Sequence, residues 1–88
     1  MKIKQGFILR ELLDQWVVMP VGQMATDYQY MIALNETGAG LWKQLASHVS
    51  ADQLVDWMCG EYEVERELAR TDVNVFLKSA REKGVLEE

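Results

Sequence analysis

The sequence predicts a single α+β domain in which a three-stranded antiparallel sheet is followed by three helices. The first third of the chain has short β-favouring runs separated by turn residues, whereas the hydrophobic pattern becomes helical after Asn35. Ser50 opens a capping box with Gln53, which is the clearest helix start in the chain. A length of 88 residues allows one hydrophobic core and little more.

The three predicted strands cover about residues 7–13, 15–21 and 28–34. The first two are expected to form a hairpin, because both are rich in apolar residues and a turn at Asp14 separates them. Pro20 cannot donate a ladder hydrogen bond, so it marks a strand end or an edge, and residues 23–27 are expected to be a connection. Side chains alternate along the third strand, which puts on one face Tyr28, Tyr30, Ile32 and Leu34.

The three predicted helices cover about residues 36–46, 51–61 and 65–83. Asn35 is a good N-cap because its side-chain oxygen can accept from a free backbone N–H, and Gly84 suits a left-handed C-terminal cap. Val85 and Leu86 are expected to fold back against the core. The apolar stripe of the last helix is expected to comprise Leu68, Ala69, Val73, Phe76, Leu77 and Ala80. Two shorter helices followed by a longer one have the outline of a helix-turn-helix core, so the fold is expected to be winged helix-turn-helix-like.

Charge and composition favour a peptide or protein as the partner. The chain has 9 Lys and Arg against 14 Asp and Glu, and its formal net charge of −5 gives no general attraction to nucleic acid or anionic lipid. It contains no apolar run of about eighteen residues, so no membrane-spanning segment is expected. The single Cys59 cannot form an internal disulfide, and no signal-peptide pattern is visible, which together predict a cytoplasmic protein.

The sequence offers little catalytic chemistry. His48 stands alone in a polar loop and is expected to be solvated. Cys59 has no close basic neighbour in the sequence and is expected to be a buried, inert thiol. One Cys and one His cannot form a structural zinc site, and the acidic residues of 61–67 suit a solvated linker and helix start. We therefore expect a binding module rather than an enzyme, with no catalytic residue, metal or cofactor.

Several segments together resemble one known family. Residues 34–42, Leu-Asn-Glu-Thr-Gly-Ala-Gly-Leu-Trp, resemble the LNETGA-x-x-W signature of the PqqD family. Residues 6–11 and 17–22 are similar to the opening hairpin of that family, and residues 61–64 to its tyrosine-acid-valine junction. Residues 72–77 and 81–86 are similar to its last helix and exit. The resemblance thus covers nearly the whole chain. We assign the signature residues Leu34, Asn35 and Trp42 to the fold, as strand end, helix cap and core anchor.

The resemblance implies a recognition element for the leader of a ribosomally made, post-translationally modified peptide. Founding members of the family hold the precursor of pyrroloquinoline quinone and present it to a radical-SAM enzyme, so the implied partners are a precursor peptide and such a separate enzyme. In the family the leader docks as an added strand beside the third strand, in a groove walled by the third helix. The peptide-binding residues that follow are Tyr28, Tyr30, Met31, Ile32, Ala33, Leu34, Arg70, Asp72, Val73, Leu77, Lys78 and Arg81.

The residues themselves agree with this role but leave alternatives. The segment 28–34 has no proline or lysine, the residues that normally protect a sheet edge, although a covering helix would explain the same observation. Val73 and Leu77 would equally suit the core. The helix order also fits a winged-helix DNA-binding protein, yet residues 61–83 carry six acidic and five basic side chains, which disfavours a basic recognition face. A purely structural subunit of a larger enzyme is the third alternative.

Overall fold

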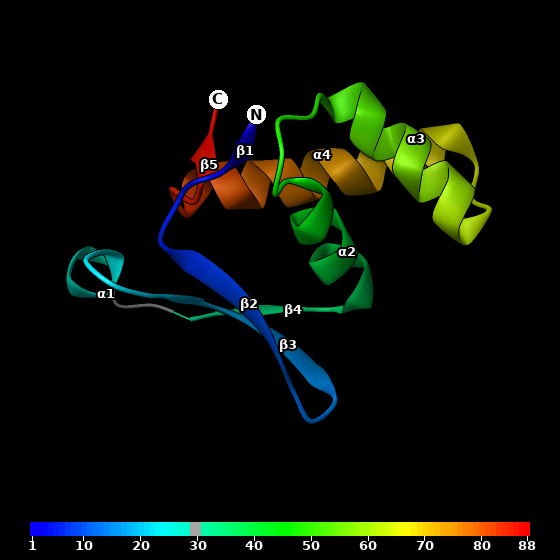
Figure 1. Ribbon diagram of the computed structural model, residues 1–88. Helices are drawn as coiled ribbons and strands as arrows, with labels where there is room; N and C mark the ends of the chain where they lie inside the picture. Colours follow the sequence, from blue (N-terminus) through cyan, green and yellow to red (C-terminus); the bar gives the residue numbers. More distant parts are fainter. Residues whose placement is uncertain (29–30) are drawn as a thin grey trace.

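The computed structural model describes residues 1–28 and 31–88 and has the α+β arrangement that the sequence predicts, with a three-stranded antiparallel sheet below a group of helices (Figure 1). In chain order its elements are β1 (Lys2–Ile3), β2 (Phe7–Leu12), β3 (Gln15–Pro20), α1 (Met24–Asp27), β4 (Ile32–Leu34), α2 (Glu36–Gln44), α3 (Ala51–Tyr62), α4 (Arg66–Glu82) and β5 (Leu86–Glu87).

The main sheet has the strand order β2-β3-β4, and both pairings are antiparallel. The predicted hairpin is present, and its turn contains Leu13 at φ 57°, a left-handed conformation that is uncommon for a residue other than glycine. The third strand is shorter than the predicted 28–34, because its pairing with β3 begins at Ile32, opposite Val18. Tyr28 instead closes α1, where its N–H donates to the carbonyl of Met24.

Two features were not predicted. Residues 23–27, expected to be a plain connection, contain the short helix α1, which has no side-chain cap. A second sheet pairs β1 with β5, so that Ile3 lies opposite Leu86. The Lys4 N–H donates to the carbonyl of Val85 at 2.9 Å, which ties the first residues to the segment after α4. Figure 1 shows both ends of the chain side by side above α4. Strands of two residues are too short to show a period-2 hydrophobic pattern, so the sequence could not predict this sheet.

The helix boundaries follow the predicted caps. The Asn35 side chain accepts a hydrogen bond from the Gly38 N–H at 2.7 Å, and α2 begins directly after Asn35, at Glu36. Ser50 and Gln53 form the complete capping box at the start of α3. Gly84 follows the last helix at φ 72°, in the left-handed region that the sequence assigned to it. These starts and stops are confirmed to within one or two residues, the usual uncertainty of a helix end.

The hydrophobic core lies between the sheet and the helices. Its largest fully buried side chains are Leu41, Leu45, Leu54, Met58, Leu77, Val18, Val55, Val73 and Val85. The predicted return of Val85 and Leu86 to the core is confirmed, since they are 1% and 7% exposed. The predicted stripe of the last helix is wrong at Leu68, which is 53% exposed, because the α4 positions that face the core begin one residue later, at Ala69.

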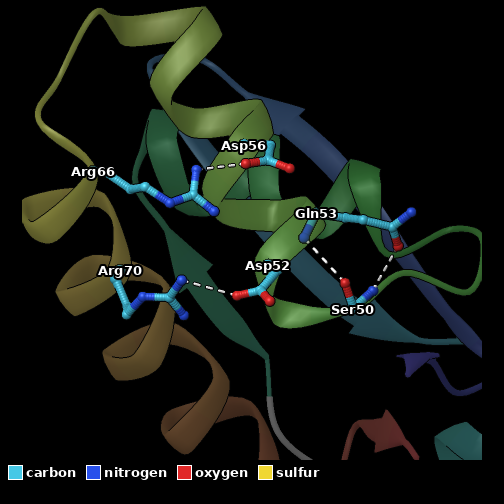
Figure 2. A network of polar contacts seen from close by, with 6 residues as sticks. All are labelled: Ser50, Asp52, Gln53, Asp56, Arg66 and Arg70. Atoms are coloured by element: carbon cyan, nitrogen blue, oxygen red, sulfur yellow. Dashed lines mark hydrogen bonds and ion pairs between the residues drawn. The ribbon is translucent and has the colours of Figure 1, made fainter.

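Two ion pairs join α3 to α4 (Figure 2). Arg66 contacts Asp56 at 2.6 Å, which raises the pKa of Arg66 above its ordinary value, chiefly through the hydrogen bond with that carboxylate. Arg70 contacts Asp52 at 2.9 Å. All four side chains are substantially exposed, so these pairs contribute little to the stability of the fold.

Asn35→Ala is expected to lower the free energy of unfolding by about 1 kcal/mol, because the Gly38 N–H loses its acceptor at the start of α2. In a domain of this size, that loss corresponds to a fall in Tm of about 4–8 °C. Asn35→Asp keeps an acceptor oxygen and serves as the control. Thermal unfolding followed by circular dichroism measures both variants, and equal Tm values for them would contradict the capping role.

Candidate functional site

The site begins at the free edge of strand β4. This strand lies at one side of the sheet and, in the part of the chain that the structure describes, pairs only with β3. Within the described residues, no backbone group hydrogen-bonds to its outer edge. Ile32–Leu34 contains neither proline nor a charged residue, so nothing in its own sequence blocks a further strand. An incoming backbone therefore meets N–H and C=O groups that are available for pairing.

An apolar groove runs between this edge and helix α4. Its central part is lined by Ile32 and Leu34 from β4 and by Phe76 and Ala80 from α4, with Trp42 of α2 among the other lining residues. Phe76 is half-buried, so its ring packs against the core while part of it borders the groove. Such a surface can take up the apolar side chains of a peptide.

The groove continues in both directions from this central part. Toward the start of α2 it is lined by Asn35, Thr37 and Asp72, and it shares Leu34, Phe76 and Ser79 with the centre. Toward α1 it shares Ile32 and Lys83 with the centre and is further lined by Tyr28, Met31 and Glu82. Because they share these residues, the three hollows lie next to one another along β4 and α4, and we refer to them together as the groove. From Asp72 to Lys83, α4 rises about 16 Å, which an extended peptide of about five residues covers.

Helix α4 uses two different faces for the core and for the groove. The core face carries Ala69, Val73, Leu77 and Ala80, which are all buried, and Ala80 also borders the centre of the groove. The groove face carries Asp72, Val75, Phe76, Ser79 and Lys83. With about 100° between successive residues, the groove face is turned by roughly a quarter of a revolution from the core face. Val75 is 65% exposed although it is apolar, so it presents an aliphatic side chain to the groove from its rim.

The structure brings together only part of the predicted binding residues. Those that line the groove are Tyr28, Met31, Ile32, Ala33, Leu34 and Asp72. Val73 and Leu77 are 0% and 2% exposed. Of the two roles that the sequence left open for them, groove wall and core, both residues therefore have the core role. Tyr30 lies outside the described residues.

The predicted basic residues lie away from the groove lining. Arg70 pairs with Asp52 of α3, and Arg81 contacts Glu88 at 3.2 Å. Both stand on the side of α4 roughly opposite the groove face. Lys78 is exposed and is not among the lining residues of the groove. None of these three therefore reaches a peptide in the groove without moving its side chain across the helix.

On α4 and its C-cap, sequence reasoning missed the groove residues Val75, Phe76, Ser79, Ala80, Glu82 and Lys83. One signal was available for Val75. It is an apolar residue that does not belong to the buried stripe, and an exposed apolar position beside an amphipathic stripe indicates a contact surface. Ser79 and Lys83 carry no such signal, because a hydroxyl and an ammonium group are ordinary on any solvated helix face.

The described residues of the groove form no recognisable catalytic constellation. Among the described residues, no group of three or more His, Cys, Asp or Glu side chains could hold a metal ion. His48 is exposed, and Cys59 is a half-buried free thiol packed against the core. In residues 1–28 and 31–88, no helix has the length and apolar character needed to cross a membrane.

Comparison with known proteins agrees with this arrangement. A family model described as coenzyme PQQ synthesis protein D (PqqD) matches residues 15–86. The chain belongs to the PqqD family. The match spans the hairpin from β3 onward, the groove and the segment after α4, so all the groove residues named above lie within it.

Two solved structures are similar to this PqqD-family chain over almost its whole length. TbiB1, solved in complex with the TbiA(beta) leader peptide, has 25% sequence identity and a TM-score of 0.77, covering 99% of this chain and 95% of its own. A lasso peptide synthetase B1, solved with its leader peptide, has 21% identity and a TM-score of 0.74, covering 99% and 96%. The second likeness concerns the fold alone. No curated protein matches the chain in a sequence comparison.

Proposed function

We propose that this PqqD-family chain binds the leader of a ribosomally made precursor peptide as an added strand along β4 and presents it to a separate modifying enzyme. The observation that carries the proposal is the unpaired edge of β4 beside an apolar groove walled by α4. The similarity to TbiB1, which was solved with a leader peptide, supports it. By analogy with founding members of the family, the proposed enzyme is a radical-SAM protein.

Strand addition divides the recognition into two parts. The backbone of the leader pairs with the edge of β4, and this part is independent of the leader's side chains. Alternate side chains of the leader then enter the groove, where Ile32, Leu34 and Phe76 favour apolar groups. The backbone pairing contributes affinity, and the fit of the apolar side chains selects the sequence.

In this proposal the chain contributes position rather than bond-making chemistry. Holding the leader keeps the attached core peptide close to the enzyme, which raises its effective concentration at the active site. No nucleophile with an adjacent base is seen among the described groove residues, and the proposal assigns any covalent step to the partner. In this proposal the chain holds the leader, and a separate enzyme modifies the core peptide attached to it.

A DNA-binding function has less support from the charges. Of the five basic residues in the last part of the chain, Arg66, Arg70 and Arg81 each contact a carboxylate. A recognition helix needs such side chains to be free for phosphates. The groove face of α4 carries one acidic residue, Asp72, and one basic residue, Lys83, so it does not form a basic surface for phosphates.

Titration of isotope-labelled protein with the leader of a short precursor encoded beside it tests the proposal by NMR. We expect micromolar or tighter binding, with amide shifts concentrated in residues 31–35 and 72–83, because these segments border the groove. A scrambled leader of the same composition is the control.

Equal shifts with both peptides, or none in the presence or absence of the neighbouring enzyme, would contradict leader binding. Tight binding to that enzyme without any affinity for the leader would favour the structural-subunit alternative. Salt-dependent binding to random duplex DNA would favour the DNA-binding one.

A further inference from the structure

The two ends of the groove differ in charge. At the end near α2 the lining residues include the carboxylate of Asp72 and no Lys or Arg. At the opposite end Glu82 and Lys83 are both present, so their charges offset each other. The centre is apolar, apart from Ser79 and Lys83. A peptide in the groove therefore meets one net charge, and it is negative.

Asp72 is available for a ligand. Asp52, Asp56 and Glu88 are each held by an arginine, whereas Asp72 has no ion pair or hydrogen-bond partner for its side chain within the described residues. It is also the position from which the groove face of α4 begins. A bound peptide that covers this end would remove water from around the carboxylate, which strengthens its attraction to a cation.

The surroundings of this end carry charges of both signs, among which the carboxylates outnumber the ammonium group. A neighbouring hollow shares Leu34 and Asn35 with the groove and is lined by Glu11, Asp14 and Glu36. Lys43 stands close by, but its ammonium group lies over the Trp16 ring, 4.3 Å from the ring centroid. The positive N-terminal end of α2 partly offsets the negative potential of the carboxylates. One of its free N–H groups, that of Gly38, already donates to the Asn35 side chain.

We propose that the peptides taken by the groove carry a lysine or arginine beside their apolar anchor residues, and that Asp72 selects it. This inference rests on the proposed function and names the substrate class within it. The sheet is antiparallel throughout, and antiparallel addition of a further strand places the start of the bound segment next to Leu34. The cation therefore belongs on the N-terminal side of the anchors, within about five residues of them.

A display selection on the full chain tests this inference without a known ligand. A library of random peptides of about twelve residues, longer than the strand that the groove accommodates, is selected on the wild type, on Asp72→Asn and on Glu67→Gln. Glu67 is the matched control, because it is an exposed carboxylate of the same helix outside the groove lining. We expect basic residues to be enriched before the apolar anchors with the wild type and with Glu67→Gln, and not with Asp72→Asn.

The best selected peptide is then synthesised for affinity measurements. Its Kd is expected to rise about two- to fivefold with Asp72→Asn, and the difference should shrink as the salt concentration rises from about 0.05 to 0.5 M. Replacing the basic residue of the peptide by glutamate should weaken binding to the wild type, and Asp72→Lys should restore it. This exchange of charges gives a readout that a general loss of fold cannot imitate.

The outcomes separate the inference from the proposed function. Enriched apolar peptides without a basic preference, or with one that persists in Asp72→Asn, would overturn the role of Asp72 and leave peptide binding in place. A selection that enriches no peptide family with any of the three proteins would overturn the proposed function, and the inference with it.

Discussion

Replacing Val75 by glutamate or by lysine is expected to weaken leader binding about tenfold or more while the fold stays intact. Val75 is 65% exposed and lines the groove, so the free protein accommodates a charged side chain there at little cost. In the complex, the same side chain would stand where an apolar group of the leader is expected to pack. Losing the burial of a valine side chain and desolvating a charge together amount to about 1.5–3 kcal/mol.

Using both charges distinguishes an apolar contact from an electrostatic one. If Val75 makes an apolar contact, both glutamate and lysine weaken binding, and lysine weakens it more because the peptide is proposed to carry a cation near Asp72. A gain in affinity with glutamate would mean that only the electrostatic potential of the groove has changed. The matched controls are Asn74→Glu and Asn74→Lys, because Asn74 is exposed next to Val75 but does not line the groove. Calorimetric titration gives the affinities, and equal loss with the Asn74 variants would contradict the assignment of the groove face.

Gly40→Ala is expected to destabilise the fold by about 1–2 kcal/mol, against the usual gain from replacing a helical glycine. Gly40 lies inside α2, and an added Cβ would overlap Cη2 of Trp57 and lie 3.1 Å from its Cζ2. The Trp57 ring is itself held edge-on against Tyr62, with ring centroids 5.8 Å apart. Overpacking therefore outweighs the lower entropy of the unfolded chain. Urea unfolding gives the change in free energy.

The Trp57→Leu background supplies the control, since it removes the ring that the added methyl group would meet. In that background Gly40→Ala is expected to stabilise the fold by about 0.5–1 kcal/mol, because only the helix preference remains. A change of sign between the two backgrounds is the predicted result. The same sign in both would mean that the close approach of α2 and α3 does not depend on this glycine.

The parts of the fold that could be predicted are those with a local physical cause. Asn35, Ser50 and Gly84 each satisfy or permit a particular backbone conformation, so a single residue type marks a helix end. The hairpin follows from two β-favouring runs around one turn. The β1–β5 sheet has no such marker, because its pairing depends on two distant segments that the rest of the fold brings together.

The site was harder to predict than the fold. Residues of β4 could be placed from the alternation of a strand and the family resemblance. On α4, however, Val73 and Leu77 are apolar at helical spacing, and this pattern is the same for a core face and for a groove wall. Only the packed structure shows which face points inward. The basic residues Arg70 and Arg81 were equally ambiguous, because ion pairs between distant segments are invisible in a single sequence.

The small β1–β5 sheet has a consequence for how the groove behaves over time. Its strands come from opposite ends of the chain, so closing it costs the most loop entropy of any pairing in the fold, and only four residues gain from it. We expect it to form last and to open first in sub-global fluctuations. Val85 connects it to the groove, since its carbonyl accepts from Lys4 and its side chain lines the central part. We therefore expect breathing of this sheet to loosen one wall of the groove and to shorten the time for which a peptide stays bound.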